Sequence, residues 1–210
     1  MAVADSGAVT KEPPMPMPAE PWSDHPTLSD ADRQTLSGVA RDSIGYGLGF
    51  DRPLPVDPSE YAAHFRRPTA TFVTLQIDEK LRGCIGALKA TRPLVVDVSE
   101  HAFAAAFRDP RFPPVTHDEK PDLGIHIAIL NPPVPINVRS KEDLLRQIRP
   151  GIDGLIIDDG PHRATFLPSV WDHLPDPERF VDQLMLKAGL STSNWTNTIK
   201  VSRYTTHDVS

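Results

Sequence analysis

Cys84 is the only cysteine in the 210-residue chain, and it lies in the hexapeptide Leu-Arg-Gly-Cys-Ile-Gly at residues 81–86. Gly83 and Gly86 carry no side chain, so backbone or a small ligand could come close to the sulfur. Arg82 could favour the thiolate if its side chain projects from the same strand face as the thiol. With no second cysteine to pair with, Cys84 has a reactive, a metal-bound or a merely packed role.

A cysteine nucleophile needs a base that accepts its proton and donors that stabilise a developing oxyanion. The backbone N–H groups around Cys84 could be those donors if their strand has an open edge. Of the eight histidines, His126 is the candidate base, because it interrupts an apolar alternation that could share a sheet with Cys84. The competing interpretation is a small packed cysteine and an ordinary solvent-facing histidine.

Two further pairs of residues are candidate binding residues. Asp109 and Arg111 flank a proline in a rigid loop, where they could pair with each other or Arg111 could hold a carboxylate or phosphate. Arg163 and Thr165 alternate on one predicted strand, so they share a face. That face could line a cleft, or its residues could pair across a hairpin.

The sequence predicts no metal site and no cofactor. It contains no Cys-x-x-Cys, no His-Glu-x-x-His, no phosphate loop and no Gly-x-Ser-x-Gly elbow. The glycines at 45, 47 and 49 do not form a dinucleotide loop, because Phe50 stands where the third glycine is needed. The acidic pair before Gly160 is typical of a hairpin turn rather than of a cation site.

Hydrophobic periodicity predicts the elements that position these residues. Helices are expected at about residues 30–48, 93–108, 140–148 and 176–187, and strands at 71–77, 81–88, 125–129, 154–157, 164–167 and 199–203. The three glycines at 45–49 are expected to end the first helix. Two hairpins mixed with separate helices favour an α+β fold over a doubly wound sheet.

Composition limits the function classes. The net charge is −6 and no Lys-Arg cluster is present, which argues against nucleic-acid binding. No apolar run reaches the roughly 20 residues that a membrane span needs. The N-terminus does not have the pattern of a secretory signal, and one cysteine suits a reducing compartment, so a cytoplasmic protein is expected. Six of the 23 prolines fall within residues 1–26, which predicts a flexible proline-rich tail before a domain at residues 27–210.

Several ordered motifs resemble those of the AMMECR-one domain family, whose bacterial and archaeal members are called AmmeMemoRadiSam system protein A. The matching segments are LRGCIG at 81–86, AFRDPRFPP at 106–114, GIDGLII at 151–157, RATFLP at 163–168 and KAGL at 187–190, followed by Trp195, Arg203 and Tyr204. The resemblance covers about residues 28–205. Family members often carry an acidic residue followed by a serine where this chain has residues 126–128, so a role of that acid would be altered or absent here.

The resemblance implies a two-lobed α+β domain, mainly antiparallel sheet with flanking helices and a smaller α/β lobe, with the hexapeptide facing the cleft between the lobes. It also implies association with a radical S-adenosylmethionine enzyme and a Memo-like protein. Two hypotheses follow. The first is an enzyme with Cys84 as nucleophile, Arg82 and His126 as its activators, and Arg111 and Arg163 holding an anionic group of a small metabolite or modified side chain. The second is a non-catalytic binding or scaffold module for one of those partners.

Overall fold

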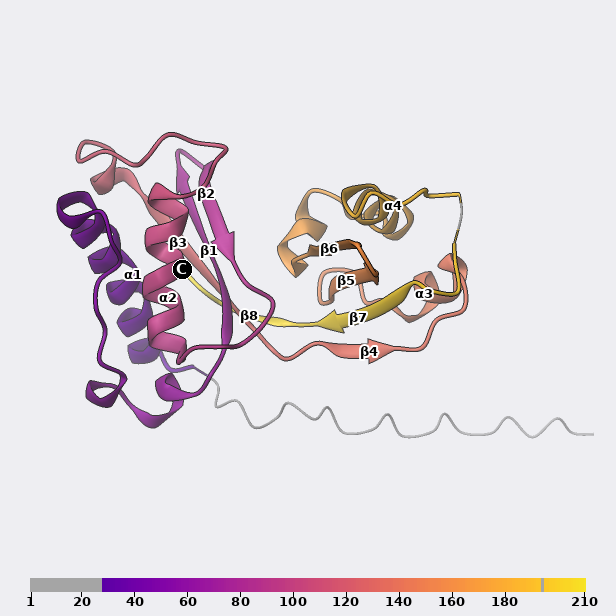
Figure 1. The fold of residues 1–210 in the computed structure, drawn as a ribbon, viewed down its shortest axis with the longest axis horizontal. Helices are drawn as coiled ribbons and strands as arrows, with labels where there is room; N and C mark the ends of the chain where they lie inside the picture. Colours follow the sequence, from indigo (N-terminus) through magenta and orange to yellow (C-terminus); the bar gives the residue numbers. More distant parts are fainter. Residues whose placement is uncertain (1–27, 194) are drawn as a thin grey trace, which may run out of the picture.

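Two four-stranded antiparallel sheets, each covered by helices, form two lobes that lie side by side in the computed structural model (Figure 1). The structure describes residues 28–193 and 195–210. The predicted proline-rich tail at residues 1–26 lies outside the described residues. The α+β class expected from the sequence is confirmed.

The first lobe contains most of the N-terminal half of the chain. Its elements are α1 (Asp30–Phe50), η1 (Pro58–Glu60), η2 (Ala63–Arg66), β1 (Ala70–Ile77), β2 (Lys80–Gly86), α2 (Leu94–Phe107), η3 (Lys120–Asp122), β3 (Gly124–Leu130) and β8 (Thr206–Val209). The strands lie in the order β2-β1-β3-β8. Alternate residues such as Val73, Leu75 and Ile127 are buried in one core with the apolar residues of α1 and α2, so both helices cover the same face of the sheet.

Helix α1 runs through the three glycines that were expected to end it. A capping box of Ser29 and Asp32 begins the helix, and Asp51 ends it in the left-handed conformation. A side chain at Gly47 would overlap the rings of Phe103 and Phe107 in α2. This glycine therefore allows the two helices to pack closely instead of stopping α1.

The second lobe is inserted between β3 and β8, which are hydrogen-bonded neighbours in the first sheet. Its elements are β4 (Val134–Ile136), α3 (Lys141–Gln147), β5 (Gly154–Asp159), β6 (His162–Phe166), η4 (Pro168–Asp172), α4 (Pro177–Lys187) and β7 (Lys200–Tyr204), with strand order β4-β7-β5-β6. Strands β4 and β8 were not predicted. Each is short, and β4 contains a proline, which only an edge strand tolerates.

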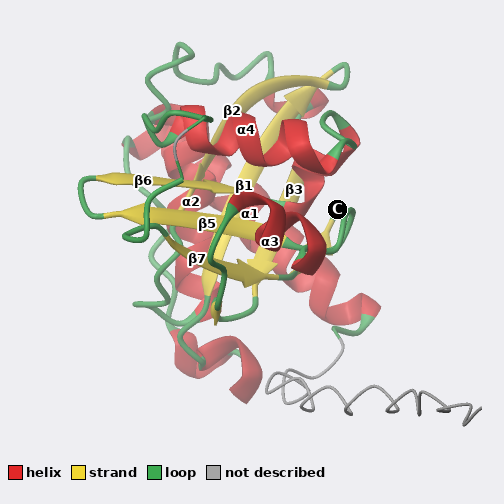
Figure 2. Ribbon diagram, turned by 90° about the vertical axis from the view of Figure 1, so that its right-hand side faces the viewer, coloured by secondary structure: helices red, strands yellow, loops and turns green. Residues whose placement is uncertain are grey.

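Two adjacent chain segments join the lobes. The Asn131 backbone N–H donates to the Thr205 carbonyl at 2.9 Å, and the Asn131 side chain donates to the Thr205 hydroxyl at 2.7 Å. A small buried cluster of Ala70, Leu130, Ile156 and Tyr204 lies between the two sheets, whose strands cross in the view along the long axis (Figure 2). These contacts fix how the lobes face each other.

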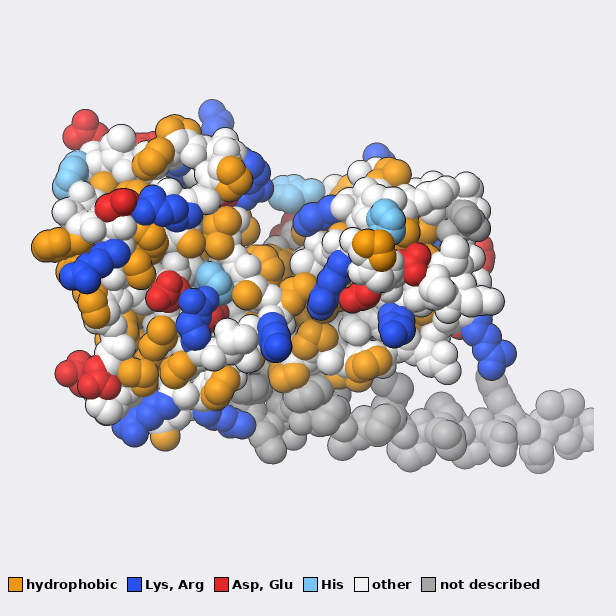
Figure 3. Space-filling view, viewed as in Figure 1, with side chains coloured by type: hydrophobic (Ala, Val, Ile, Leu, Met, Phe, Trp, Pro, Cys, Tyr) orange, Lys and Arg blue, Asp and Glu red, His pale blue; other side chains and the backbone are white. Residues whose placement is uncertain are grey.

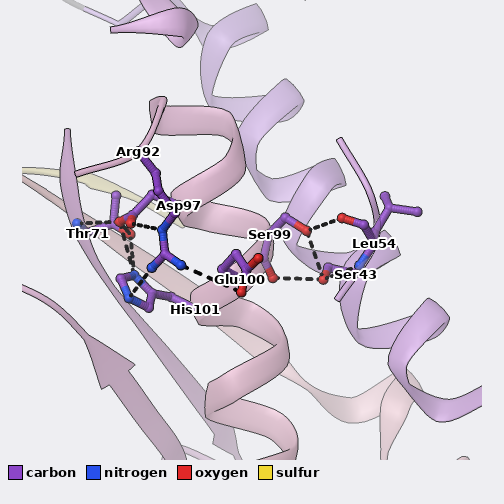
Figure 4. Close-up of polar contacts among 8 residues, drawn as sticks. All are labelled: Ser43, Leu54, Thr71, Arg92, Asp97, Ser99, Glu100 and His101. Atoms are coloured by element: carbon purple, nitrogen blue, oxygen red, sulfur yellow. Dashed lines mark hydrogen bonds and ion pairs between the residues drawn. The ribbon is translucent and has the colours of Figure 1, made fainter. Parts of the chain in front are cut away.

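A buried polar network ties α2 to β1 in the first lobe (Figure 4). The Asp97 carboxylate accepts hydrogen bonds from the Thr71 N–H at 3.0 Å and the Thr71 hydroxyl at 2.8 Å, and it lies 3.1 Å from His101 Nδ1. Burial opposes ionisation of Asp97, but His101, Thr71 and the Arg92 charge together hold its pKa below the usual value. His101 therefore has a structural role in the first lobe, through its contact with Asp97.

Candidate functional site

Cys84 lies on β2, the edge strand of the first sheet, and it is half-buried. It pairs in register with Thr74 of β1, and both side chains project from the face opposite α2, because their neighbours Val73 and Leu75 point into the helix-covered core. The Thr74 hydroxyl donates to the Cys84 Sγ at 3.3 Å. The thiol therefore faces the second lobe and has a hydroxyl donor beside it.

His126 shares the sheet with Cys84, as the sequence suggested, but Thr74 stands between them. Thr74 pairs with Cys84 on one side and with His126 of β3 on the other. Two strand spacings, roughly 10 Å, therefore separate the backbones of Cys84 and His126. His126 is exposed and lines a surface pocket of about 400 Å³ beside α1. The structure does not bring this imidazole into hydrogen-bonding contact with the thiol.

The Asp109–Arg111 pair covers the open edge of β2 at Cys84. The Asp109 carboxylate accepts the Cys84 backbone N–H at 2.9 Å, and Arg111 Nη2 donates to the Cys84 carbonyl at 3.1 Å. The two side chains also bind each other, with Arg111 Nη2 2.6 Å and Nε 2.9 Å from the carboxylate oxygens. The pair thus takes the place that a neighbouring strand would occupy.

The charge of Asp109 is strongly favoured in this arrangement. The hydrogen bonds from Arg111 hold the pKa of the Asp109 carboxyl well below its usual range despite burial, and the Cys84 N–H contributes in the same direction. Because Asp109 already accepts the Cys84 N–H, that group is not a free oxyanion donor. Of the two roles that the sequence left open for Asp109 and Arg111, the structure shows the mutual pair.

Arg82 is held by Glu119 rather than placed against the thiol. A β-bulge leaves Arg82 without a partner in β1, and its guanidinium binds both Glu119 oxygens, Nε at 2.7 Å and Nη2 at 3.1 Å. These bonds lower the pKa of Glu119 to about 2, against the opposing effect of burial. The positive charge of Arg82 is thus compensated by Glu119, which leaves other cations to act on Cys84.

Gly83 and Gly86 allow β2 to pack closely against its neighbours, and they do not open a path to the Cys84 sulfur. A side chain at Gly83 would overlap the Ala105 carbonyl oxygen in α2, and one at Gly86 would overlap the Phe72 ring and the Thr71 carbonyl. The space beside each glycine is therefore filled by protein atoms. Both glycines let the cysteine strand lie tightly on its neighbours.

The second lobe presents its own edge strand, β6, to the cleft. Arg163 lies 3.6 Å from the carboxylate of Asp158, its cross-strand partner, and is more than half exposed. The Thr165 hydroxyl donates to the Leu155 carbonyl at 2.8 Å. Both predicted binding residues therefore make internal contacts in the second lobe, and they share one face as expected.

Lys187, at the last turn of α4, is a candidate site residue that the sequence reasoning missed. Its Nζ donates to the Thr165 carbonyl at 3.0 Å and lies 5.1 Å from the centroid of the Phe166 ring. Burial lowers the pKa of Lys187, the charge of Cys84 opposes this effect, and Arg111 adds to it. The ammonium thus interacts electrostatically with Cys84 and Arg111 of the first lobe. The only signal for Lys187 in the sequence was its position in the KAGL segment, and that motif does not indicate where the side chain points.

The surface is hollowed between the lobes, and Lys or Arg side chains stand on both walls of the hollow (Figure 3). A half-buried thiol with Arg111 on its own lobe and Lys187 on the other lobe makes this region the candidate site. Within residues 28–193 and 195–210, no three His, Cys, Asp or Glu side chains gather as a metal site. None of the described helices is long and apolar enough to cross a membrane.

Comparison with known proteins places these features in a family. The AMMECR1 family model matches residues 38–209. A protein of Methanothermobacter thermautotrophicus is 39% identical over 166 residues, covering 78% of this chain and 85% of that protein. Protein MJ0810 of Methanocaldococcus jannaschii is 38% identical over 148 residues, covering 69% and 74%.

A solved structure supports the same assignment. The crystal structure of the uncharacterized protein PH0010 from Pyrococcus horikoshii superposes with a TM-score of 0.79 at 30% identity, covering 87% of this chain and 92% of that one. The family match spans both lobes, the cysteine strand and Lys187. The chain therefore belongs to the AMMECR1 family, as the resemblance of its motifs predicted.

Proposed function

We propose that the cleft between the lobes is the active site of an enzyme in which Cys84 is the nucleophile and the substrate is a small molecule or modified side chain with an anionic group. One observation carries the proposal. A half-buried thiol receives a hydroxyl hydrogen bond from Thr74, has Arg111 bound to its own carbonyl, and interacts electrostatically with Lys187 of the other lobe. Both cations and the hydroxyl can stabilise the negative charge of a sulfur nucleophile during its attack.

The chemistry is covalent group transfer or hydrolysis. The thiolate sulfur forms a bond to an electrophilic carbon or phosphorus, while the bond to the leaving group breaks and that group departs with the electron pair. Water or a second substrate then attacks the same atom, the bond to sulfur breaks, and the thiolate is restored. We expect Lys187 rather than His126 to exchange the proton in these steps, because Thr74 separates His126 from the thiol in the sheet.

The test is the alkylation rate of Cys84 by iodoacetamide at pH 7.5, measured by intact mass in the native and the unfolded chain. We expect the native thiol to react at least as fast as N-acetylcysteine, and Cys84→Ser to remove all labelling. The variant Arg82→Met should leave the rate within about twofold, because Glu119 binds that guanidinium. A native thiol that stays unlabelled, while the unfolded chain labels fully, would leave the cleft as a docking surface for a radical S-adenosylmethionine or Memo-like partner.

A further inference from the structure

We infer that Lys187 and Arg111 form a split anion-binding subsite beside Cys84, one cation from each lobe, suited to a carboxylate or a phosphate group. The inference rests on the proposed function, since it names the group by which a substrate would be held next to the thiol. The inference gives Lys187 a binding role, which the KAGL motif alone does not indicate. Three features of the cleft support it.

Lys187 is a cation without a carboxylate. Its only hydrogen bond within residues 28–193 and 195–210 goes to a neutral carbonyl, that of Thr165. Other cations of this protein behave differently: Lys141 pairs with Asp182 at 2.6 Å, and Arg82 with Glu119 at 2.7 Å. The ammonium of Lys187 has no carboxylate to compensate its charge, and an anionic ligand would supply one.

The second feature is the presence of another cation across the cleft. The charge of Arg111 acts on Lys187 and disfavours its protonated form. Asp109 neutralises part of the Arg111 charge, but Arg111 Nη1 has no acceptor among the described residues. Two cations with unused donors attract a carboxylate or phosphate oxygen.

Both cations are held in place before any ligand arrives. Arg111 donates to the carbonyl of Cys84, and its guanidinium lies 5.5 Å from the centroid of the Phe112 ring. Lys187 donates to the carbonyl of Thr165 and lies over the ring of Phe166. Each cation is thus tied to the edge strand of its own lobe, which reduces the entropy lost on binding an anion.

The two groups differ in the anion geometry that they recognise. Arg111 offers a planar fork and Lys187 a compact point charge with two remaining N–H donors. A carboxylate or phosphate held between them would bring its neighbouring atoms to the Cys84 sulfur. Because Lys187 belongs to the second lobe, such a ligand would also bridge the two lobes.

The test compares two alkylating reagents that differ in charge but react in the same way at sulfur. We would measure the rate constants of iodoacetate and iodoacetamide with Cys84 and divide their ratio by the ratio found for N-acetylcysteine. The expected normalised ratio is about fivefold or more in favour of the anionic reagent. In Lys187→Met the ratio should fall to about one, and Lys187→Arg should retain most of it.

Matched controls distinguish anion binding by Lys187 from a general effect of its charge on the thiol. Lys200→Met removes the same charge from an exposed position of β7 and should leave the ratio unchanged. If Lys187→Met slows both reagents equally, Lys187 only promotes the thiolate, and the subsite is refuted. A normalised ratio of one in the unmodified protein refutes it as well.

A second measurement applies even if the thiol proves unreactive, an outcome that would refute the proposed function alone. Inorganic phosphate would be titrated into the Cys84→Ser protein and followed by calorimetry, at low and at high salt. We expect binding that weakens about fivefold or more in Lys187→Met and is unchanged in Lys200→Met. Absence of phosphate binding, or equal binding by both variants, would overturn the inference.

Discussion

Asp109 accepts the backbone N–H of Cys84 at 2.9 Å through a carboxylate that is almost completely buried. The edge of a sheet normally exposes unpaired backbone groups. At Cys84 both outward-facing backbone groups are instead satisfied by one ion pair, because Arg111 binds the carbonyl. The backbone that carries the thiol is therefore held by side chains of a loop that follows α2.

The first prediction concerns this ion pair. Replacing Asp109→Ala leaves the Cys84 N–H without its acceptor and Arg111 without its carboxylate, so unfolding in urea should show a loss of roughly 1–3 kcal/mol. The loss stays in this range because Arg111 is more than half exposed and still donates to the Cys84 carbonyl. Glu178→Ala, which removes an exposed partner of Lys141, should cost less than about 1 kcal/mol. Equal losses in the two variants would show that the Asp109 contacts contribute no special stability.

The second prediction concerns acid stability through Glu119. The folded-state pKa of Glu119 is lowered to about 2, mainly by the hydrogen bond from Arg82. A folded pKa below the unfolded one means that the unfolded chain binds the proton first as pH falls. The stabilisation is therefore complete above about pH 4.5 and is lost as pH falls toward 2.

The measurement is the free energy of unfolding between pH 6 and pH 2.5. Glu119→Gln should lower stability at pH 6 and flatten its decrease below pH 4.5, whereas Glu60→Gln, in the exposed η1 turn, should change neither. A variant curve that runs parallel to the original over this range contradicts the prediction.

The third prediction concerns Gly83. A methyl group at this position would overlap the Ala105 carbonyl oxygen, so β2 and α2 must separate. Gly83→Ala should destabilise the protein by roughly 1–3 kcal/mol or more and lower its thermal unfolding midpoint. At Gly38, within α1, a side chain meets no atom within 4 Å, so Gly38→Ala should stabilise by about 0.5–1 kcal/mol. The two variants should therefore shift the midpoint in opposite directions.

The fourth prediction concerns the hydroxyl beside the sulfur. Thr74 donates to Cys84 Sγ, and this bond orients the sulfur and stabilises its negative charge during attack. Its loss in Thr74→Val should slow alkylation at pH 7.5 by about fivefold, which corresponds to a hydrogen bond of about 1 kcal/mol. Thr74→Ser keeps the hydroxyl and should retain most of the rate. If serine and valine slow the reaction equally, the methyl packing of Thr74 matters and its hydroxyl does not.

Much of the local structure could be read from the sequence, because periodicity and caps are local properties. The capping box at Ser29, the helix after Pro93 and the hairpin that carries Cys84 all lie where they were expected. Helix α1 departs from its predicted end because packing against α2 outweighs the poor helix propensity of glycine. The short strands β4 and β8 form because neighbouring strands pair with them. Their local sequence patterns do not predict them.

The sequence by itself determined that a single thiol lies on a hairpin strand of an α+β chain of the AMMECR1 family, and that Asp109 and Arg111 stand close together. Only the tertiary structure decided which charges meet that thiol. Lys187 lies 103 positions after Cys84 in the chain, and it reaches the cleft because the second lobe is inserted between two paired strands of the first. Arg82, two positions away, is instead bound by Glu119. Electrostatic effects depend on distance and burial in space, which separation along the chain does not fix.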